Sequence, residues 1–249
     1  YIYFVKTTFQ IYALEEVFQS FIFIFLAIFL AYMIINSGAT TLSGVMNILR
    51  HSSVVGIIAF GMGLVIITGG IDLSVGSMLP LIGGISVVAF NKTNSVLLTI
   101  LTALLAGAFL GFINGFLIGK VKMPAFIVTL ATMLIFRSLA QYYLRTMGQS
   151  IYNMDGTLSS YEGFYGFGQA KLFAIPMVGF IFILITILAV FISTSTKFGK
   201  SVFALGSNEK AAKLAGINVE WIRVLVFVIT GSLAGISTTL WLAMNGSVD

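Results

Sequence analysis

Asp72 is the one charged residue in the long apolar tract that covers residues 54–90. It lies in ITGGIDLSVGS (67–77), after two glycines and two positions before Ser74. An ionisable group in a membrane segment is costly and marks a candidate functional site. Two interpretations stay open. Asp72 either caps the next helix by accepting hydrogen bonds at its positive end, or helps to shape the path of a transported molecule.

Arg137 is a second charged residue inside an apolar run, between TLATMLIF and SLAQYY, with no acidic residue nearby in the sequence. A lone buried Arg needs a partner or an aqueous cavity, whereas an Arg near the membrane surface extends its charged group to water. Thr129, on the same run, is a candidate for lining a polar path or for bonding its own helix backbone. Asn114, in the preceding run, is expected to form an interhelical hydrogen bond.

No set of residues in the sequence points to catalysis or metal binding. There is one histidine and no cysteine, so a Ser/His/Asp arrangement and a sulfur-based metal site are not supported. The HExxH motif, paired intramembrane carboxylates and the P-loop, GxxxxGK(S/T), are also missing from the sequence. We therefore expect no catalytic residues, no metal and no cofactor bound by this chain, and no ATP hydrolysis by the chain itself.

The composition predicts the elements that position these residues. Of 249 residues, 59% are hydrophobic and 8% are charged, whereas soluble domains carry about 25% charged residues. This balance predicts an all-α polytopic transmembrane helix bundle, a single domain over residues 1–249. A helical span needs roughly 20 apolar residues, and about seven such runs are expected. They lie at about 17–36, 96–119, 124–145, 172–195 and 222–244, with two short spans in 54–90 that break at GGID (69–72).

Positive residues predict the orientation, because loops rich in Lys and Arg stay in the cytoplasm. With a cytoplasmic N-terminus, the inner side holds Lys6, Lys120, Lys122, Lys197, Lys200, Lys210, Lys213 and Arg223, and the outer side holds Arg50, Lys92, Arg145 and Lys171. The 197–223 loop is then cytoplasmic. The net charge of +5 is spread over these loops, which does not indicate a nucleic-acid partner. The chain begins at Tyr1 and stops at Asp249, just after an apolar run, so we expect both ends to be truncated.

Four glycines in GAFLGFINGFLIG recur at four-residue intervals: Gly107, Gly111, Gly115 and Gly119. This spacing places them along one helical face, where another helix can approach closely. GSLAG (231–235) repeats the spacing once. Simple helix packing is one interpretation, and a pore-lining helix that slides against its neighbour is the other.

The stretch 198–221, FGKSVFALGSNEKAAKLAGINVEW, is strongly polar for this chain. Asn208 is suited to cap a helix that Glu209 begins and Gly216 ends in a left-handed conformation. A helix of about two turns is unstable alone in water. It must pack on its own domain, lie in the lipid headgroups or dock into the groove of a partner. Its small alanine face fits a protein groove better than lipid.

Three motifs in the same order resemble one family. FGKSVFALGSNEKAAKLAGINV is similar to the cytoplasmic coupling loop of ribose-type (simple sugar) ABC transporter permeases of bacteria. ITGGIDLSVGS resembles their motif between the second and third spans, and GFINGFLIGKVKMPAFIVTLATMLIFRSLA resembles their central segment. Together the motifs cover most of the chain from about residue 50 to 236.

The resemblance implies a membrane subunit, located in the bacterial inner membrane, that works with a second permease subunit on a dimer of cytosolic ATPases. The ATPases use ATP and Mg, and an extracytoplasmic binding protein delivers a sugar such as ribose, galactose or xylose. Such permeases have about ten spans, so we expect the C-terminal spans to be absent from this chain. Permeases for nucleosides, autoinducer-type sugars or branched-chain amino acids are alternatives, and a self-powered secondary transporter or an intramembrane enzyme is less favoured.

The resemblance also implies roles for individual residues. Within a coupling loop over 198–220, Ala211 and Ala212 would let the short helix enter an ATPase cleft, where Glu209 would meet a basic residue. The residues implied in coupling are Gly199, Gly206, Asn208, Glu209, Ala211, Ala212 and Gly216. The candidates for the translocation path are Asp72, Ser74, Asn114, Thr129 and Arg137.

Overall fold

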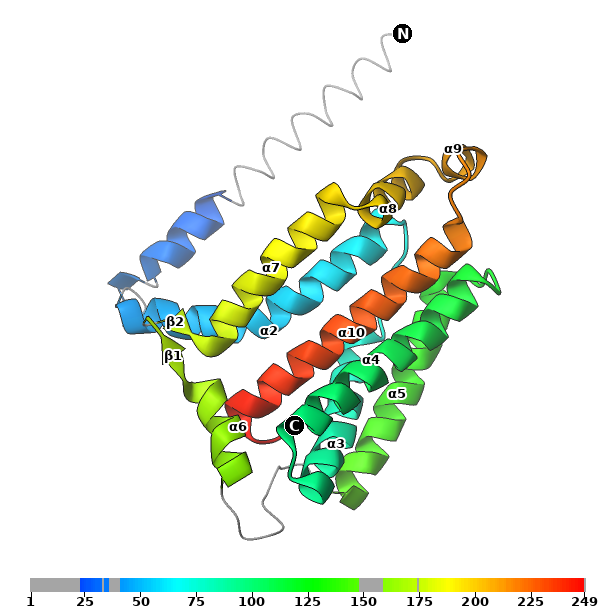
Figure 1. The fold of residues 1–249 in the computed structure, drawn as a ribbon. Helices are drawn as coiled ribbons and strands as arrows, with labels where there is room; N and C mark the ends of the chain where they lie inside the picture. The colour runs from blue at the N-terminus through cyan, green and yellow to red at the C-terminus, as the bar shows by residue number, and fades with distance from the viewer. Residues whose placement is uncertain (1–22, 33, 36–40, 148–158, 174, 249) are drawn as a thin grey trace. The chain divides into compact units, whose positions relative to one another are not determined.

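The computed structural model describes residues 23–32, 34–35, 41–147, 159–173 and 175–248, and they are almost entirely helical (Figure 1). The chain divides into a short unit that ends at Ile48 and a larger unit that begins at Leu49. In the short unit, residues 23–32 form an apolar helix. The other helices are α2 (Leu42–Ile67), α3 (Val75–Thr93), α4 (Val96–Gly119), α5 (Ala125–Met147), α6 (Ser159–Gln169), α7 (Met177–Ser195), α8 (Lys197–Ser207), α9 (Glu209–Leu214) and α10 (Val219–Asn245).

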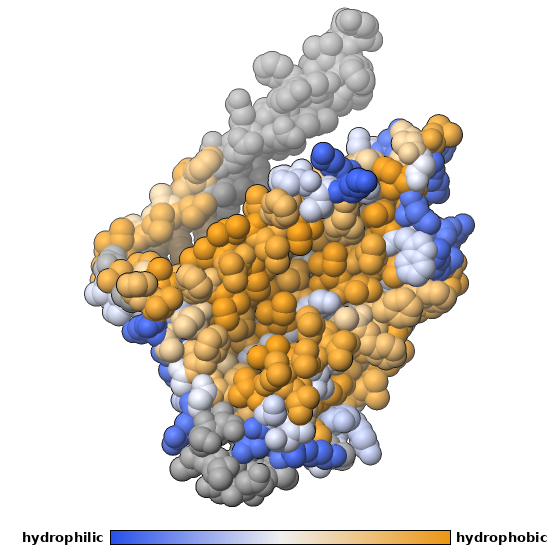
Figure 2. All heavy atoms as spheres, in the orientation of Figure 1, coloured by the Kyte–Doolittle hydropathy of each residue, from blue (hydrophilic) through white to orange (hydrophobic). Residues whose placement is uncertain are grey.

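Six of the described helices are long and apolar enough to cross a membrane: α2, α3, α4, α5, α7 and α10. Each overlaps a span predicted from the sequence, which confirms the all-α membrane bundle. Of the remaining predicted span, 17–36, residues 23–32 form a shorter apolar helix, and residues 17–22, 33 and 36 lie outside the described residues. In Figure 2 the surface over the long helices is apolar, and hydrophilic residues gather at the two ends of the bundle.

The prediction of two short spans in 54–90 is wrong for the first of them, because α2 begins at Leu42 and runs for 26 residues. Arg50, expected between spans on the outer side, lies within this helix. It is within the first three turns, so its side chain can reach water along the helix. The break after α2 is at the predicted place, with Gly69 at φ +76°.

Asp72 is not the N-cap of α3, contrary to one of the two interpretations. Ser74 holds that position, and Asp72 lies two residues earlier. Its Oδ1 accepts from the backbone N–H and the hydroxyl of Ser74, at 2.9 and 2.6 Å. The carboxylate therefore stabilises the turn that precedes α3. It does not accept hydrogen bonds from the first N–H groups of that helix.

The polar segment before α7 follows α5, and residues 148–158 of it lie outside the described residues. Its described part contains α6 and a two-stranded antiparallel hairpin, in which β1 (Lys171–Leu172) pairs with β2 (Ile175–Pro176). Gln169 Nε2 donates to the carbonyl oxygen of Met244, at 2.9 Å, near the end of α10. Figure 1 shows α6 and the C-terminus at one end of the larger unit and α8 and α9 at the other.

The centre of the larger unit is the contact between α4 and α10. A Cβ added to Gly107 or Gly111 would clash with the carbonyl oxygens of Gly231 and Phe227 on α10, respectively. At Gly115 and Gly119, the added atom would lie 2.7 Å from Val224 O and 2.6 Å from Glu220 O. The predicted glycine face therefore lies directly on the backbone of α10, as small-residue faces of membrane helices do.

Apolar layers surround this pair. Met78, Ile82 and Phe136 bring α3 and α5 against Ala103 and Ala234 of the central pair. Val54, Ile57 and Val178 bring α2 and α7 against Leu240 of α10. Both helices of the central pair are therefore held in place from more than one side.

Gly115→Leu is expected to lower the midpoint temperature of thermal unfolding in detergent. Its side chain would push Val224 and separate α4 from α10, and such overpacking costs about 1–3 kcal/mol. Gly63→Leu is the matched control, because a Cβ at Gly63 on α2 meets no atom within 4 Å. Equal unfolding temperatures for the two variants would contradict the α4–α10 contact.

Candidate functional site

The polar segment between α7 and α10 folds into two short helices, of which the sequence predicted only the second. Thr196 caps α8 by accepting from the backbone N–H of Gly199, at 3.2 Å. Val202 and Leu205 on one face of α8 are buried. Gly206 is part of α8 and lies against the end of α2, where a Cβ would clash with the carbonyl oxygen of Ile67. Gly199 and Gly206 thus permit close approach of backbones.

The second helix, α9, has the predicted boundaries. The side chain of Asn208 accepts from the backbone N–H of Ala211, at 3.0 Å, and Gly216 has φ +81°. Ala212 differs from the prediction, because it is buried against Leu205 and Val219 and is not exposed to a partner. The opposite face is open to solvent, with Lys210 and Ala211 exposed.

Leu214 at the end of α9 is 90% exposed. It lies with the exposed Ala211 on the open side of α9, where the two side chains offer a small apolar surface. Sequence reasoning missed this residue, although AAKLAG (211–216) contains it as the one bulky apolar side chain in a run of small and charged residues.

Glu209, which the resemblance implies would meet a basic residue of an ATPase, forms two ion pairs within the chain. Its carboxylate accepts from Lys213 Nζ and from Arg223 Nη2, both at 2.6 Å. The hydrogen bond from Lys213, and then that from Arg223, lower the pKa of the Glu209 carboxyl. Arg223 belongs to α10, so the pair joins α9 to the first turns of the long helix.

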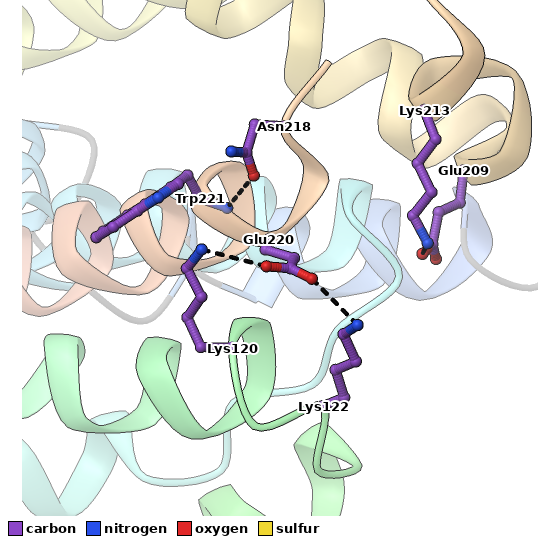
Figure 3. Close-up of polar contacts among 7 residues, drawn as sticks. All are labelled: Lys120, Lys122, Glu209, Lys213, Asn218, Glu220 and Trp221. Atoms are coloured by element: carbon purple, nitrogen blue, oxygen red, sulfur yellow. Dashed lines mark hydrogen bonds and ion pairs between the residues drawn. The ribbon is translucent and has the colours of Figure 1, made fainter. Parts of the chain in front are cut away.

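A second ion-pair group binds the start of α10 to the turn between α4 and α5 (Figure 3). The two oxygens of Glu220 accept from Lys120 Nζ, at 3.2 Å, and Lys122 Nζ, at 3.1 Å. Lys120 Nζ also lies 4.7 Å from the ring centroid of Trp221. Asn218 caps α10 by accepting from the backbone N–H of Trp221, at 3.2 Å. All these contacts lie at the end of the unit that carries α9.

A cavity of about 390 Å³ lies between the two ion-pair groups. It is lined by Gly69 and Gly70 of the α2–α3 break, by the α4–α5 turn, and by charged side chains from both groups: Glu209, Lys213, Arg223, Glu220 and Lys122. Charged groups therefore form part of its wall, and the backbone of the break forms another part.

Four of the five path candidates meet at the α2–α3 break. Asn114 Nδ2 donates to Ser74 Oγ, at 2.8 Å, and Ser74 Oγ donates to Asp72 Oδ1. Thr129 Oγ1 lies 3.2 Å from the carbonyl oxygen of Ile71 and 2.9 Å from that of Ala125. Asp72, Ser74, Asn114 and Thr129 are all buried, and we call them the polar cluster.

Two acceptors of the polar cluster have no hydrogen-bond partner among the described residues: Asp72 Oδ2 and Asn114 Oδ1. An unsatisfied buried acceptor costs about 1–3 kcal/mol. The cluster thus keeps hydrogen-bonding capacity that the described residues do not use.

Arg137 is the exception among the path candidates. It is exposed on α5, two turns beyond Thr129, and forms no ion pair with a described residue. Eight residues along a helix turn the side chain by about 80° from the starting face, since each residue adds about 100°. The polar cluster therefore does not include Arg137.

Comparison with known proteins identifies the family of the chain. Residues 44–249 match the family described as branched-chain amino acid transport system / permease component. The chain belongs to this family. No solved structure matches the chain significantly.

Members of this permease family with curated names are similar over most of the chain. The ribose import permease protein RbsC of Haemophilus influenzae is 37% identical over 219 residues, which cover 88% of this chain and 66% of that protein. RbsC of Escherichia coli is 34% identical, over 84% of this chain and 64% of that protein. The xylose transport system permease protein XylH of Haemophilus influenzae is 30% identical, over 89% of this chain and 74% of that protein. The chain thus spans slightly less than two thirds of the ribose permeases.

Ser74→Ala is expected to destabilise the protein by about 1–3 kcal/mol, because it removes the link between Asn114 and Asp72 and leaves buried polar groups unpaired. The midpoint of thermal or denaturant unfolding measures this loss. Ser201→Ala is the matched control, since its hydroxyl bonds only the carbonyl oxygen of Lys197 on the exposed part of α8. A loss no larger than that of the control would show that the link is not formed.

The attachment of α9 is expected to weaken at acid pH. The pKa of the Glu209 carboxyl is lowered in the folded protein. The ionised carboxylate therefore holds α9 fully above the ordinary carboxyl pKa, and this hold is lost as the pH falls through the lowered pKa. Fluorescence anisotropy of a dye on Leu214→Cys should stay constant near neutrality and fall in acid. In the Glu209→Gln background the anisotropy should be low and independent of pH. An unchanged acid transition in that background would assign it to another group.

Proposed function

We propose that the chain is the membrane-spanning subunit of an ATP-driven importer and that α9 is its docking element for a cytosolic ATPase. The observation that carries the proposal is the two-sided character of α9. One face is fixed to the chain by Ala212 and by the bonds of Glu209, while Ala211 and Leu214 are exposed on the other. A helix of six residues is unstable alone, and prior attachment lets it present a fixed apolar surface to a groove.

The distribution of positive residues supports a cytoplasmic position for α9. Lys120, Lys122, Lys197, Lys200, Lys210, Lys213 and Arg223 lie at the end of the bundle with α9, against Arg50, Lys92, Arg145 and Lys171 towards the other. Membrane helices retain the more positive side in the cytoplasm. On this basis α9 faces the cytoplasm, and α6 and the hairpin face outward. The proposed location is the inner membrane of a bacterium, and the bacterial relatives support it.

The proposed substrate is a simple sugar of the ribose or xylose type. Support comes from the named relatives, which are ribose and xylose permeases. The polar cluster fits this class in chemical terms, because its two unused acceptors match the hydroxyl donors of a sugar. In this proposal Asp72, Ser74, Asn114 and Thr129 border the path, and Arg137 does not. A nucleoside or a branched-chain amino acid is the alternative that uptake assays would distinguish.

The proposed partners follow from this role. A cytosolic ATPase hydrolyses ATP with Mg. A second permease subunit completes the pathway, and an extracytoplasmic binding protein delivers the sugar. The large apolar surfaces of the long helices are suited to lipid: Ile187 and Phe191 of α7, for example, are 62% and 58% exposed. No role in nucleic-acid binding and no catalytic residue are included in the proposal.

Disulfide cross-linking tests the docking of α9. A cysteine at Ala211 in the full-length permease is expected to form a disulfide with cysteines scanned along the groove of the co-expressed ATPase, with a yield that changes on addition of ATP. Ala212→Cys is the matched control. Ala212 is next to the exposed Ala211, but it is itself only 3% exposed and faces the chain. Equal yields at the two positions, or none at either with both proteins assembled, would contradict the proposal. This chain contains no native cysteine to interfere.

A further inference from the structure

The central helix pair connects the two sites described above. α4 and α10 are in direct backbone contact from Gly119, beside Glu220, to Ala103, beside Gly235. The contact is reciprocal, because a Cβ at Gly107 would clash with the carbonyl oxygen of Gly231 and a Cβ at Gly231 with that of Gly107. Helices interlocked through their backbones cannot slide without opening the contact, so a displacement of one is shared by the other.

One end of this pair is tied to α9. Arg223 of α10 binds Glu209 of α9 at 2.6 Å, and its side chain is 28% exposed. Glu220, one turn earlier, holds the end of α4 through Lys120. The first turns of α10 therefore connect α9 on one side and the end of α4 on the other.

The middle of the pair is tied to the α2–α3 break. Asn114 lies on α4 between Gly111 and Gly115, and its Nδ2 binds Ser74 Oγ at 2.8 Å. Ser74 Oγ in turn binds the carboxylate of Asp72 at 2.6 Å. Buried hydrogen bonds of this kind are strong and directional, so movement of α4 displaces the turn that contains Asp72.

The break is able to respond because it is not part of a helix. Gly69 has a left-handed φ of +76°, and the side chains of Ile71 and Leu73 are 52% and 38% exposed. On its other side the break touches α5, through Thr129 and the carbonyl oxygen of Ile71. A shift of α4 relative to α5 must therefore change the backbone of the break, as hinge segments absorb motion between rigid elements.

We propose that the α4–α10 pair acts as a lever that transmits displacement of α9 to the Asp72–Ser74–Asn114 chain, with Arg223 as the positioning residue at the input and Asn114 at the output. This inference rests on the proposed function, because an ATPase must displace α9. It goes further by assigning how that displacement reaches the polar cluster. The ion pairs on α10 then serve transmission between α9 and the two long helices.

Electron paramagnetic resonance of a nitroxide on Leu73→Cys tests the lever in the full-length permease, assembled with its ATPase in lipid nanodiscs. The ratio of mobile to immobile spectral components reports the conformation of the break. Trapping the ATPase with ATP and vanadate is expected to change this ratio by about 5-fold or more, the lower end of typical coupling between sites. Arg223→Gln should abolish the change, and Arg223→Lys, which retains a donor for Glu209, should restore most of it.

Asn114→Ala examines the output without altering α9. The spectral change at the break is expected to be lost in this variant while α9 still docks, which the disulfide yield through Ala211→Cys measures. Lys200→Gln is the control for both variants, because Lys200 is an exposed residue of α8 that forms no ion pair with a described residue. A parent-like spectral change in Arg223→Gln or in Asn114→Ala overturns the lever.

The two levels of the proposal fail differently. If the ATPase does not assemble with the permease, or if the parent protein shows no spectral change on nucleotide trapping, the proposed function and the lever both fall. If the parent responds, cross-links through Ala211→Cys and retains the response in Asn114→Ala, docking stands and the lever alone is overturned.

Discussion

The contact between the backbones of α4 and α10 is the constraint on which the other features of the larger unit depend. Membrane helices gain little from burying apolar side chains against each other, because lipid is equally apolar. Close approach gains dispersion contacts instead, and the glycines from Gly107 to Gly119 allow it. This contact fixes where the first turn of α10 lies, and hence which side chains Glu220 and Arg223 can reach. It also fixes Asn114 opposite Ser74.

The polar cluster shows how an acidic residue is tolerated in so apolar a chain. A carboxylate buried alone would carry a large desolvation cost. Here the backbone turns at Gly69, and the N–H and hydroxyl of Ser74 both donate to one carboxylate oxygen. Asp72 thus stabilises the turn between the two helices, although burial of its carboxylate carries the desolvation cost. Irregular backbone at this depth is tolerated where protein or a cavity surrounds it, and the cavity beside Gly69 and Gly70 meets this condition.

Local features of the sequence predicted local structure well. The long apolar runs predicted the long helices, and the glycine spacing predicted the face of α4 that another helix approaches closely. Asn208 and Gly216 marked the limits of α9 because capping involves only neighbouring residues. Four path candidates also came together as one cluster. The sequence could not show that Ala212 faces Leu205 and Val219, since burial of one side of a short helix depends on distant packing. Nor could it show that Glu209 pairs with Arg223, fourteen residues away, or that Arg137 lies outside the cluster.

The reciprocity of the glycine contact limits how the chain can change over evolutionary time. The atoms that leave no room for a side chain at Gly107 and Gly231 are carbonyl oxygens of the facing helix. Every amino acid carries that oxygen, so no replacement on the facing helix can create the missing space. A larger residue at either position therefore has no suppressor at the other, whereas a clash between two side chains would have one. Substitution at these positions requires the helices themselves to move apart.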